Sequence, residues 1–238
     1  MRYLLTIITK INKAGGNRKG EMKRINFIWI GLVLISLTSA YAYDNHDFQV
    51  WNTEVEEFKV NKNSKISLEQ EFRWGNNAGD FYYQHYDVGY IYLLNNYFNF
   101  GGGFRYIKQK SADKFRDVSE PYLAAFMFWN PAGFNLSNRM RFEYRYADYQ
   151  SDAYVFRNKL DIKFPWKFTR LAIQPMVADE IFFKFNGGDF NENRLFAGFA
   201  FNPVKYIKAE IYYMLRSTKS SGVWKDTNVL GTKLKLSF

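Results

Sequence analysis

The 238-residue chain contains no cysteine, two histidines and five prolines. Without cysteine it can form no disulfide, no thiolate metal site and no cysteine nucleophile. It also lacks any stretch of about 20 apolar residues, which excludes an ordinary membrane-spanning helix. The sequence shows no cluster of metal ligands, no phosphate-binding loop and no nucleotide-binding motif. We therefore expect no cofactor and no metal.

Aromatic residues are abundant instead. They make up 20% of the chain, with 24 Phe and 18 Tyr, yet the mean hydropathy is −0.39. A soluble domain rarely carries so many aromatic residues, and a helical membrane protein is far more apolar. The combination is typical of a barrel in which apolar and polar residues alternate and average out.

The longest apolar run is Phe27–Leu37. It follows Lys23 and Arg24 and precedes the tripeptide Ala-Tyr-Ala at 40–42. A basic start, a short apolar core and a small-x-small site are the parts of a cleaved secretory signal peptide. We predict that residues 22–42 are this signal peptide.

Residues 1–21 precede a signal peptide that is already complete from Met22 onward. Codons for residues 19–22 (Lys-Gly-Glu-Met) can read as a ribosome-binding sequence followed by a start codon. We therefore predict that Met22 is the true start, that residues 1–21 are an upstream extension, and that 43–238 form the mature protein. The alternative is a long basic start to the same signal peptide.

The formal net charge of +10 is concentrated near the N-terminus. Residues 1–42 hold seven Lys or Arg and one acidic residue, so the rest of the chain has 26 basic and 22 acidic residues, a net charge of +4. Nucleic-acid binding, which depends on a strong positive field, loses its main support. We expect no nucleic-acid partner.

From Phe48 onward, apolar and polar residues alternate in segments of about ten residues, separated by clusters of Asn, Gly, Asp, Ser and Pro. In one such segment Ile66 and Leu68 share one face, while Lys65 and Glu69 share the other. The predicted strands are 48–58, 64–74, 81–94, 97–108, 118–129, 133–147, 153–164, 169–183, 192–201, 205–216 and 226–238. We predict an all-β fold: a transmembrane antiparallel β-barrel of about 10–12 strands over residues 43–238.

The predicted connections are short and long in turn, for example short at 61–63 and long at 109–116. Outer-membrane barrels have short periplasmic turns and longer extracellular loops, so the alternation predicts the two sides. Eleven strands conflict with both ends in the periplasm, which requires an even number. Either one segment is misread, or Asp44–Phe48 begins a short extra strand.

The C-terminal strand ends with alternating Leu234 and Leu236 and a terminal Phe238. A terminal aromatic residue on an amphipathic strand is the signal that outer-membrane proteins present to their assembly machinery. We expect a bacterial (Gram-negative) outer-membrane protein, exported through the periplasm. Its partners would be the assembly machinery, outer-membrane lipid and lipopolysaccharide.

A soluble barrel of the lipocalin type remains an alternative, because it has the same alternation with the apolar face turned inward. The apolar face here is unusually aromatic. Tryptophans 74, 129, 166 and 224 also lie near strand ends, where the aromatic girdles of membrane barrels belong. Both features favour the membrane.

The order of several segments resembles an uncharacterised family of outer-membrane barrels, domain of unknown function 2490. The matching segments are Trp51, Leu68–Arg73 (LEQEFR), Tyr83–Tyr90 (YQHYDVGY), Gly101–Tyr106 (GGGFRY), Arg141–Arg145 (RFEYR), Pro175 and Glu180–Phe183 (EIFF). The resemblance implies location and architecture, and supplies no catalytic or ligand-binding residues. A more distant likeness, to monomeric porins for acidic oligosaccharides, rests on architecture and arginine-rich lumens alone.

The polar face carries many charged side chains. Facing lipid, each Arg or Lys would cost about 2–4 kcal/mol at the bilayer midplane, so we expect these side chains to line the lumen. The candidates are Glu69, Glu71, Arg73, His85, Asp87, Arg105, Arg139, Arg141, Glu143, Arg157, Lys159, Asp161, Glu180, Arg194 and Glu210. They can form a structural ion-pair network in a closed barrel, or line a narrow pore that prefers small anionic solutes. Both interpretations stay open.

A barrel hydrolase is a third alternative. His85 and Asp87 share the polar face, so Asp87 could orient the imidazole toward Ser137 as nucleophile. The predicted strands of His85 and Ser137 are not neighbours, however, and no serine has a local signature. We expect that the protein is not an enzyme.

Register gives a further prediction. Facing residues of 133–147 and 153–164 should sum to about 300, because this sets Glu143 against Arg157 and Arg139 against Asp161. The turn after Leu94 should likewise bring Asp87 beside Arg105.

Three glycines, Gly89, Gly101 and Gly103, fall on the inward face of adjacent predicted strands. Glycine weakens a strand unless something needs the room. They could make room for the side chain of Arg105 or Arg73, border a pore constriction, or mark a bend of the barrel wall.

Overall fold

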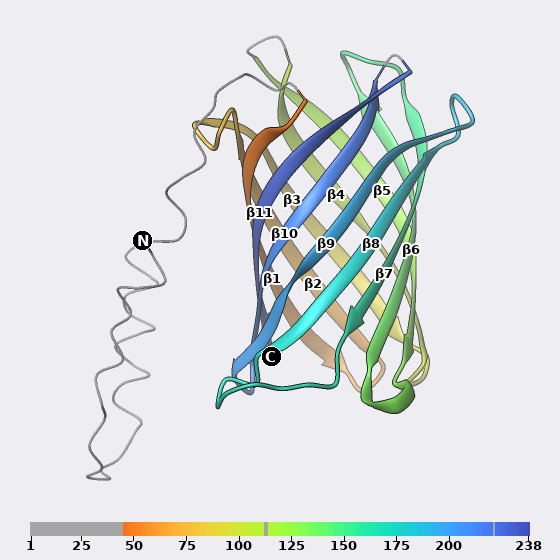
Figure 1. Ribbon diagram of the computed structural model, residues 1–238. Coiled ribbons are helices and arrows are strands. Elements are labelled where there is room, and N and C mark those ends of the chain that lie inside the picture. Colours follow the sequence, from red (N-terminus) through yellow and green to blue (C-terminus); the bar gives the residue numbers. More distant parts are fainter. Residues whose placement is uncertain (1–44, 112–113, 221) are drawn as a thin grey trace, which may run out of the picture. The chain divides into compact units, whose positions relative to one another are not determined.

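The computed structural model describes residues 45–111, 114–220 and 222–238, which form one closed barrel (Figure 1). The strands are β1 (Asp47–Asn61), β2 (Ser64–Gly75), β3 (Asp80–Leu93), β4 (Phe98–Ser111), β5 (Lys114–Trp129), β6 (Asn135–Ala147), β7 (Ala153–Lys163), β8 (Gln174–Lys184), β9 (Asp189–Val204), β10 (Ile207–Ser220) and β11 (Val223–Ser237). A short 3-10 turn, η2 (Pro131–Gly133), follows β5. The predicted extension and signal peptide, residues 1–42, lie outside the described residues.

Each strand pairs antiparallel with its neighbours in sequence, and the barrel closes where β1 meets β11 in parallel. The closing register runs from Asp47 opposite Thr227 to Glu57 opposite Ser237. The expectation of an even strand number is therefore wrong. An odd number of alternating strands makes the first and last run the same way, and parallel pairing still satisfies both backbone edges. As a result, β1 begins at the rim opposite to the one where β11 ends.

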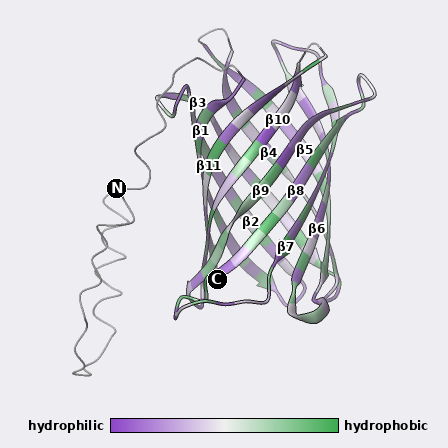
Figure 2. Ribbon diagram, viewed as in Figure 1, coloured by the Kyte–Doolittle hydropathy of each residue, from purple (hydrophilic) through white to green (hydrophobic). Residues whose placement is uncertain are grey.

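The two faces of the wall differ sharply in chemistry. On β3, Tyr86, Val88 and Tyr90 are about half exposed on the outside, whereas His85 and Asp87 are buried inside. Hydropathy alternates along the strands in the same way (Figure 2). Apolar residues thus face outward and charges inward, the reverse of a lipocalin-type barrel.

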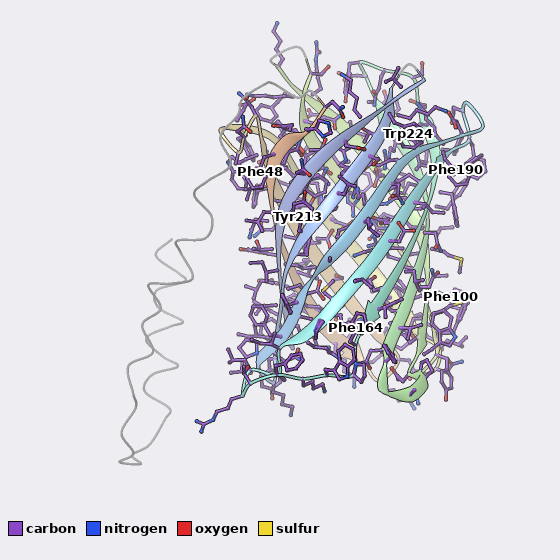
Figure 3. The ribbon with its side chains drawn as sticks, viewed as in Figure 1. Phe48, Phe100, Phe164, Phe190, Tyr213 and Trp224 are labelled. Carbon is purple, nitrogen blue, oxygen red and sulfur yellow. The ribbon has the colours of Figure 1, made fainter. Side chains whose placement is uncertain are left out.

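Aromatic side chains gather outside toward both ends of the barrel. Phe48, Phe190 and Trp224 lie toward one rim and Phe164 toward the other (Figure 3). At the seam, the terminal Phe238 stacks on Phe58 of β1 with ring centroids 5.3 Å apart. In the part of the chain that the structure describes, no helix is long and apolar enough to cross a membrane.

The connections differ from the predicted alternation of short turns and long loops. The β4–β5 pairing continues to Ser111 opposite Lys114, through most of the predicted loop 109–116. The longest connection is 164–173, at the rim where β11 ends and where only short turns were expected; β8 begins at Gln174 rather than at 169. Strands extend further than their apolar pattern because polar residues at their ends still pair in the ladder. Lys110, for example, bonds Asp80 across β4 and β3 at 2.5 Å.

Candidate functional site

The predicted lumen residues all occupy inward-facing register positions. They are Glu69, Glu71 and Arg73 on β2, His85 and Asp87 on β3, Arg105 on β4, Arg139, Arg141 and Glu143 on β6, Arg157, Lys159 and Asp161 on β7, Glu180 on β8, Arg194 on β9 and Glu210 on β10. They come together in a lumen that is largely filled with side chains, where several carboxylates are almost fully buried.

Arg105 is the centre of a first ion-pair cluster. Its side chain lies 3.0 Å from Asp87, 3.2 Å from Glu120 and 3.4 Å from Glu69. Asp87 and Glu120 stand directly opposite Arg105 on the two neighbouring strands. The predicted Asp87–Arg105 contact is confirmed. One guanidinium thus supplies a counter-charge to three carboxylates inside the barrel.

A second cluster is built around Arg157, which bonds Glu143 at 2.7 Å and Glu180 at 2.9 Å. Glu180 also accepts from Arg139 at 2.7 Å. Arg145 joins the two clusters, since it lies 2.8 Å from Glu143 and 2.7 Å from Glu120 of the first. The network therefore ties β2 through β8 together from the inside.

The predicted register of β6 and β7 is wrong by two residues. Arg139 faces Lys159 and Arg141 faces Arg157, so the facing pairs sum to 298. The predicted and observed sums are both even, so each side chain lies on its predicted face. Glu143 still contacts Arg157, now as a diagonal neighbour rather than a directly opposed one. The predicted pairing of Arg139 with Asp161 does not form: Arg139 reaches Glu180, while Asp161 lies 3.1 Å from Lys159. A partner two strands away lies outside any argument from neighbouring strands alone.

A stack of cations and rings crosses the lumen. The guanidinium of Arg73 lies between the rings of Trp51 and Tyr83, at 3.6 and 3.8 Å from their centroids. The guanidinium carbon of Arg194 lies 5.1 Å from the centroid of the same Trp51 ring and 4.5 Å from that of Phe182. Because Trp51 belongs to β1 and Arg194 to β9, this stack spans strands that do not pair.

Two acidic residues of this network are missing from the predicted set. Glu120 is fully buried between Arg105 and Arg145. Glu192 bonds Arg194 at 2.6 Å and Arg216 at 2.8 Å. Glu120 sits on an inward face of mostly apolar residues, so polarity gave no signal. Register could have found it, because the tight β4–β5 turn sets Glu120 directly opposite Arg105.

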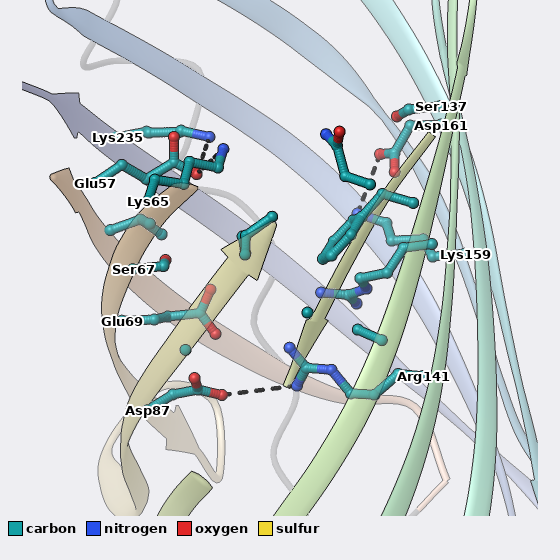
Figure 4. A pocket seen from close by; sticks show the side chains of 18 of the residues that line it. Glu57, Lys65, Ser67, Glu69, Asp87, Ser137, Arg141, Lys159, Asp161 and Lys235 are labelled. Atoms are coloured by element: carbon teal, nitrogen blue, oxygen red, sulfur yellow. Dashed lines mark hydrogen bonds and ion pairs between the residues drawn. The ribbon is translucent and has the colours of Figure 1, made fainter. Parts of the chain in front are cut away.

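A vestibule lies toward the rim where β11 ends, because its lining includes Lys233 and Lys235 of β11 and Glu57 of β1. Figure 4 shows part of its lining, with Glu57, Lys65 and Lys235 together and Asp87 beside Arg141. Its volume is about 360 Å³, and a cavity of about 80 Å³ adjoins it at mid-height. Its cationic lining is Lys65, Lys159, Lys163, Lys208, Lys233, Lys235, Arg139 and Arg141, and its acidic lining is Glu57, Glu69, Asp87, Asp161 and Glu210. The lining thus holds eight cationic and five acidic side chains.

Two of the three inward glycines, Gly89 and Gly103, make room for a tyrosine rather than an arginine. A Cβ on Gly103 would lie 2.5 Å from the Tyr122 hydroxyl, and one on Gly89 2.9 Å from it. That hydroxyl donates to Asp87 at 2.6 Å, and the guanidinium of Arg141 stacks on the Tyr122 ring at 3.8 Å. Gly89 and Gly103 thus leave room for the Tyr122 side chain, which covers them, a known device for glycine in sheets.

The arrangement around His85 differs from the one that a hydrolase would need. Its two ring nitrogens lie 3.1 Å from the Tyr83 hydroxyl and 3.1 Å from Glu69. Asp87, the expected orienting residue, instead bonds Arg105 and Tyr122. Among the described residues no group of three or more His, Asp or Glu side chains is placed to hold a metal.

The fold and lumen define a closed β-barrel with an apolar exterior and a charged interior. The chain belongs to the family described as "Protein of unknown function (DUF2490)", whose model matches residues 48–227. No curated protein matches it.

Among solved structures, the chain is similar to an anion-selective porin from Comamonas acidovorans. The TM-score is 0.37 and the identity 11%, over 71% of this chain and 55% of the porin. The chain thus spans about half the length of the porin, and the likeness concerns the fold alone.

Proposed function

We propose that this chain is a bacterial outer-membrane barrel that is closed at mid-height and is exposed to solutes through a cationic vestibule at one end. Its outward face supports the membrane location, because large apolar side chains such as Tyr90, Leu123 and Leu195 are at least half exposed there. A soluble barrel would pack these residues inside or cover them.

Polar side chains on the outer face also support a membrane location, because they form hydrogen bonds with each other. Asn138 and Asn158 are diagonal neighbours on the outer face of β6 and β7 and exchange two hydrogen bonds, at 3.0 and 2.9 Å. In a hydrocarbon environment an unpaired amide is costly, and reciprocal pairing removes the need for water.

In this proposal the end of β11 lies on the periplasmic side, as in other outer-membrane barrels, so the vestibule opens toward the periplasm. Lipid and lipopolysaccharide surround the apolar wall. The assembly machinery reads Leu234, Leu236 and Phe238 after export. Membrane fractionation of cells expressing the chain should find it in the outer membrane with heat-modifiable gel migration, and recovery as a soluble periplasmic protein would sink the proposal.

The observation that carries the closed state is the stack of Tyr83, Arg73, Trp51, Arg194 and Phe182, in which every member is buried. Displacing a guanidinium from between two rings loses cation–π attraction as well as packing. We accordingly propose neither steady conduction nor catalysis for this barrel.

Planar-bilayer recording tests the closed state. The wild type should give no discrete conductance steps, whereas the double variant Trp51→Ala/Phe182→Ala, which removes two rings, should conduct. The matched control Phe190→Ala/Trp224→Ala removes two outward rings and should stay silent. Discrete, anion-selective steps from the wild type would contradict closure.

That result would favour a second candidate, a narrow anion-preferring pore. The vestibule supports this candidate by its excess of cations and by its continuity with the mid-height cavity, since Glu69, Arg139, Lys159, Glu210 and Lys233 line both.

A further inference from the structure

The inner end of the vestibule holds a buried arginine whose donors are not used. Arg141 is 6% exposed and lines the cavity. Its Nε and Nη1 have no hydrogen-bond acceptor among the described residues. The carboxylates that come nearest are those of Asp87 and Glu143, at 3.7 and 3.8 Å from Nη1, which is beyond hydrogen-bond distance.

Like charges surround this arginine in the ladder. Arg141 directly faces Arg157, and the next inward pair is Arg139 opposite Lys159. Directly opposed like charges destabilise a sheet unless counter-charges offset them. Arg157 and Arg139 find acids on other strands, but Arg141 has only the two distant carboxylates. The site is short of one negative charge.

At the mouth of the vestibule, too, positively charged side chains outnumber the carboxylates that could pair with them. Lys65 and Lys235 share one carboxylate, Glu57, at 2.9 and 2.7 Å. Lys208 directly faces Lys235 across β10 and β11. Lys208 has no ion-pair partner among the residues that the structure describes. A positive field therefore extends from the mouth to the inner end of the vestibule.

One wall of the vestibule is apolar. Ala124, Phe126 and Phe128 point inward from β5, and the register sets Ala124 opposite Arg141 and Phe126 opposite Arg139. Directly opposed Cβ atoms lie about 4.5–5.5 Å apart. A flat apolar group against Phe126 would thus lie beside the guanidinium groups of β6.

We propose that the vestibule binds an organic carboxylate with a flat apolar body. Its carboxylate accepts from the terminal nitrogens Nη1 and Nη2 of the Arg141 guanidinium, and its body packs against Phe126. Arg141 suits this role because its guanidinium presents two parallel donors and already rests on Tyr122, so little side-chain freedom is lost on binding. This inference deepens the proposed function, since it names what the blind vestibule takes up.

Calorimetric titration of the folded, full-length mature barrel in detergent micelles tests it with three probes. Benzoate carries charge and body, acetate carries charge alone, and benzamide is the neutral analogue of benzoate. Benzoate should bind most tightly, acetate more weakly and benzamide not at all. Equal binding of benzamide, or no binding of benzoate, would overturn the proposal.

Variants then locate the site. Arg141→Gln should weaken benzoate binding by about tenfold or more, because a charge-assisted pair is lost. Phe126→Leu should weaken benzoate but leave acetate unchanged. Lys219→Gln removes a lysine of the same strand as Lys208 at the other rim, and should change nothing. Unchanged binding in a folded Arg141→Gln barrel would refute the assignment.

If the Arg141→Gln variant fails to fold, the Lys208→Gln variant can be used to test the proposal instead. Lys208 is exposed and unpaired with any described acid, so its loss should leave folding intact and weaken benzoate by about two- to fivefold. No weakening would overturn the proposal. The bilayer and binding experiments test the two proposals independently. A conducting barrel that binds benzoate contradicts the closed state alone. A barrel that does not conduct and does not bind benzoate contradicts this inference alone.

Discussion

The guanidinium carbon of Arg73 lies 3.6 Å from the centroid of the Trp51 ring, on the strand paired with β2. Arg73 also bonds Glu71 at 2.6 Å, so its charge is neutralised while its flat face packs. This contact joins the two ways in which the lumen is filled, ion pairing along the wall and stacking across it.

Removing the ring should therefore destabilise the barrel as well as open it. We expect Trp51→Ala to lower the free energy of unfolding by about 3–5 kcal/mol, the usual effect of deleting a buried aromatic side chain. Urea titration in micelles, followed by far-ultraviolet circular dichroism, measures it. Trp224→Ala, at an outward position that is 45% exposed, is the control and should change stability little.

Glu143 should matter far more than Asp161. Glu143 is fully buried and bonds both Arg157 and Arg145, so Glu143→Gln should cost about 3–5 kcal/mol of unfolding free energy. Asp161 pairs with Lys159 at a partly exposed position, so Asp161→Ala should cost less than about 1 kcal/mol.

The same titration gives both values. Adding Arg157→Gln to Glu143→Gln should cost less than the sum of the two single changes, because the arginine is no longer left without its nearest acid. Strict additivity would show that the pair is energetically independent.

The fit between Gly231 and Tyr212 predicts a suppressor. A Cβ on Gly231 would overlap the ring of Tyr212, which lies inside the barrel. Gly231→Ala should lower stability by about 1–3 kcal/mol, and Tyr212→Leu in the same chain should recover part of it. Gly187→Ala, whose Cβ would meet nothing within 4 Å, should be neutral. A double variant as unstable as the sum of its parts would argue against a clash with the ring.

The contact between Phe238 and Phe58 predicts an effect on assembly rather than on the folded barrel. Phe238→Ala removes the stacked ring but keeps the backbone bonds that join it to β1, from Lys59 N at 3.2 Å and to Glu57 O at 2.9 Å. We expect slower appearance of the heat-modifiable form in cells and little change in unfolding free energy. Phe238→Tyr should assemble normally.

Period-two alternation was enough to predict a barrel of about 10–12 strands and the inward position of every candidate lumen residue, because side chains on a strand point to opposite faces in turn. Residues 64–74, for example, became β2 with one added glycine. The Asp87–Arg105 pair followed as well, since a tight turn leaves little freedom of register. These features depend on local sequence alone.

The β6–β7 register, by contrast, was misjudged by a step of two, which keeps every side chain on its own face. Alternation cannot distinguish such registers, and pairing of opposite charges chose the wrong one. The true register sets Arg141 against Arg157 and is tolerated because Glu180 on β8 and Glu143 supply the acids.

The sequence by itself determined which residues form strands and which face of each strand carries charge, because both follow from the two-residue repeat and the chemistry of single side chains. Only the tertiary structure decided how the barrel closes, which acid each arginine meets, and that Tyr122 fills the space left by Gly103. Those outcomes depend on long side chains reaching across a closed lumen. Residues far apart in the chain become neighbours there only when all eleven strands are in place.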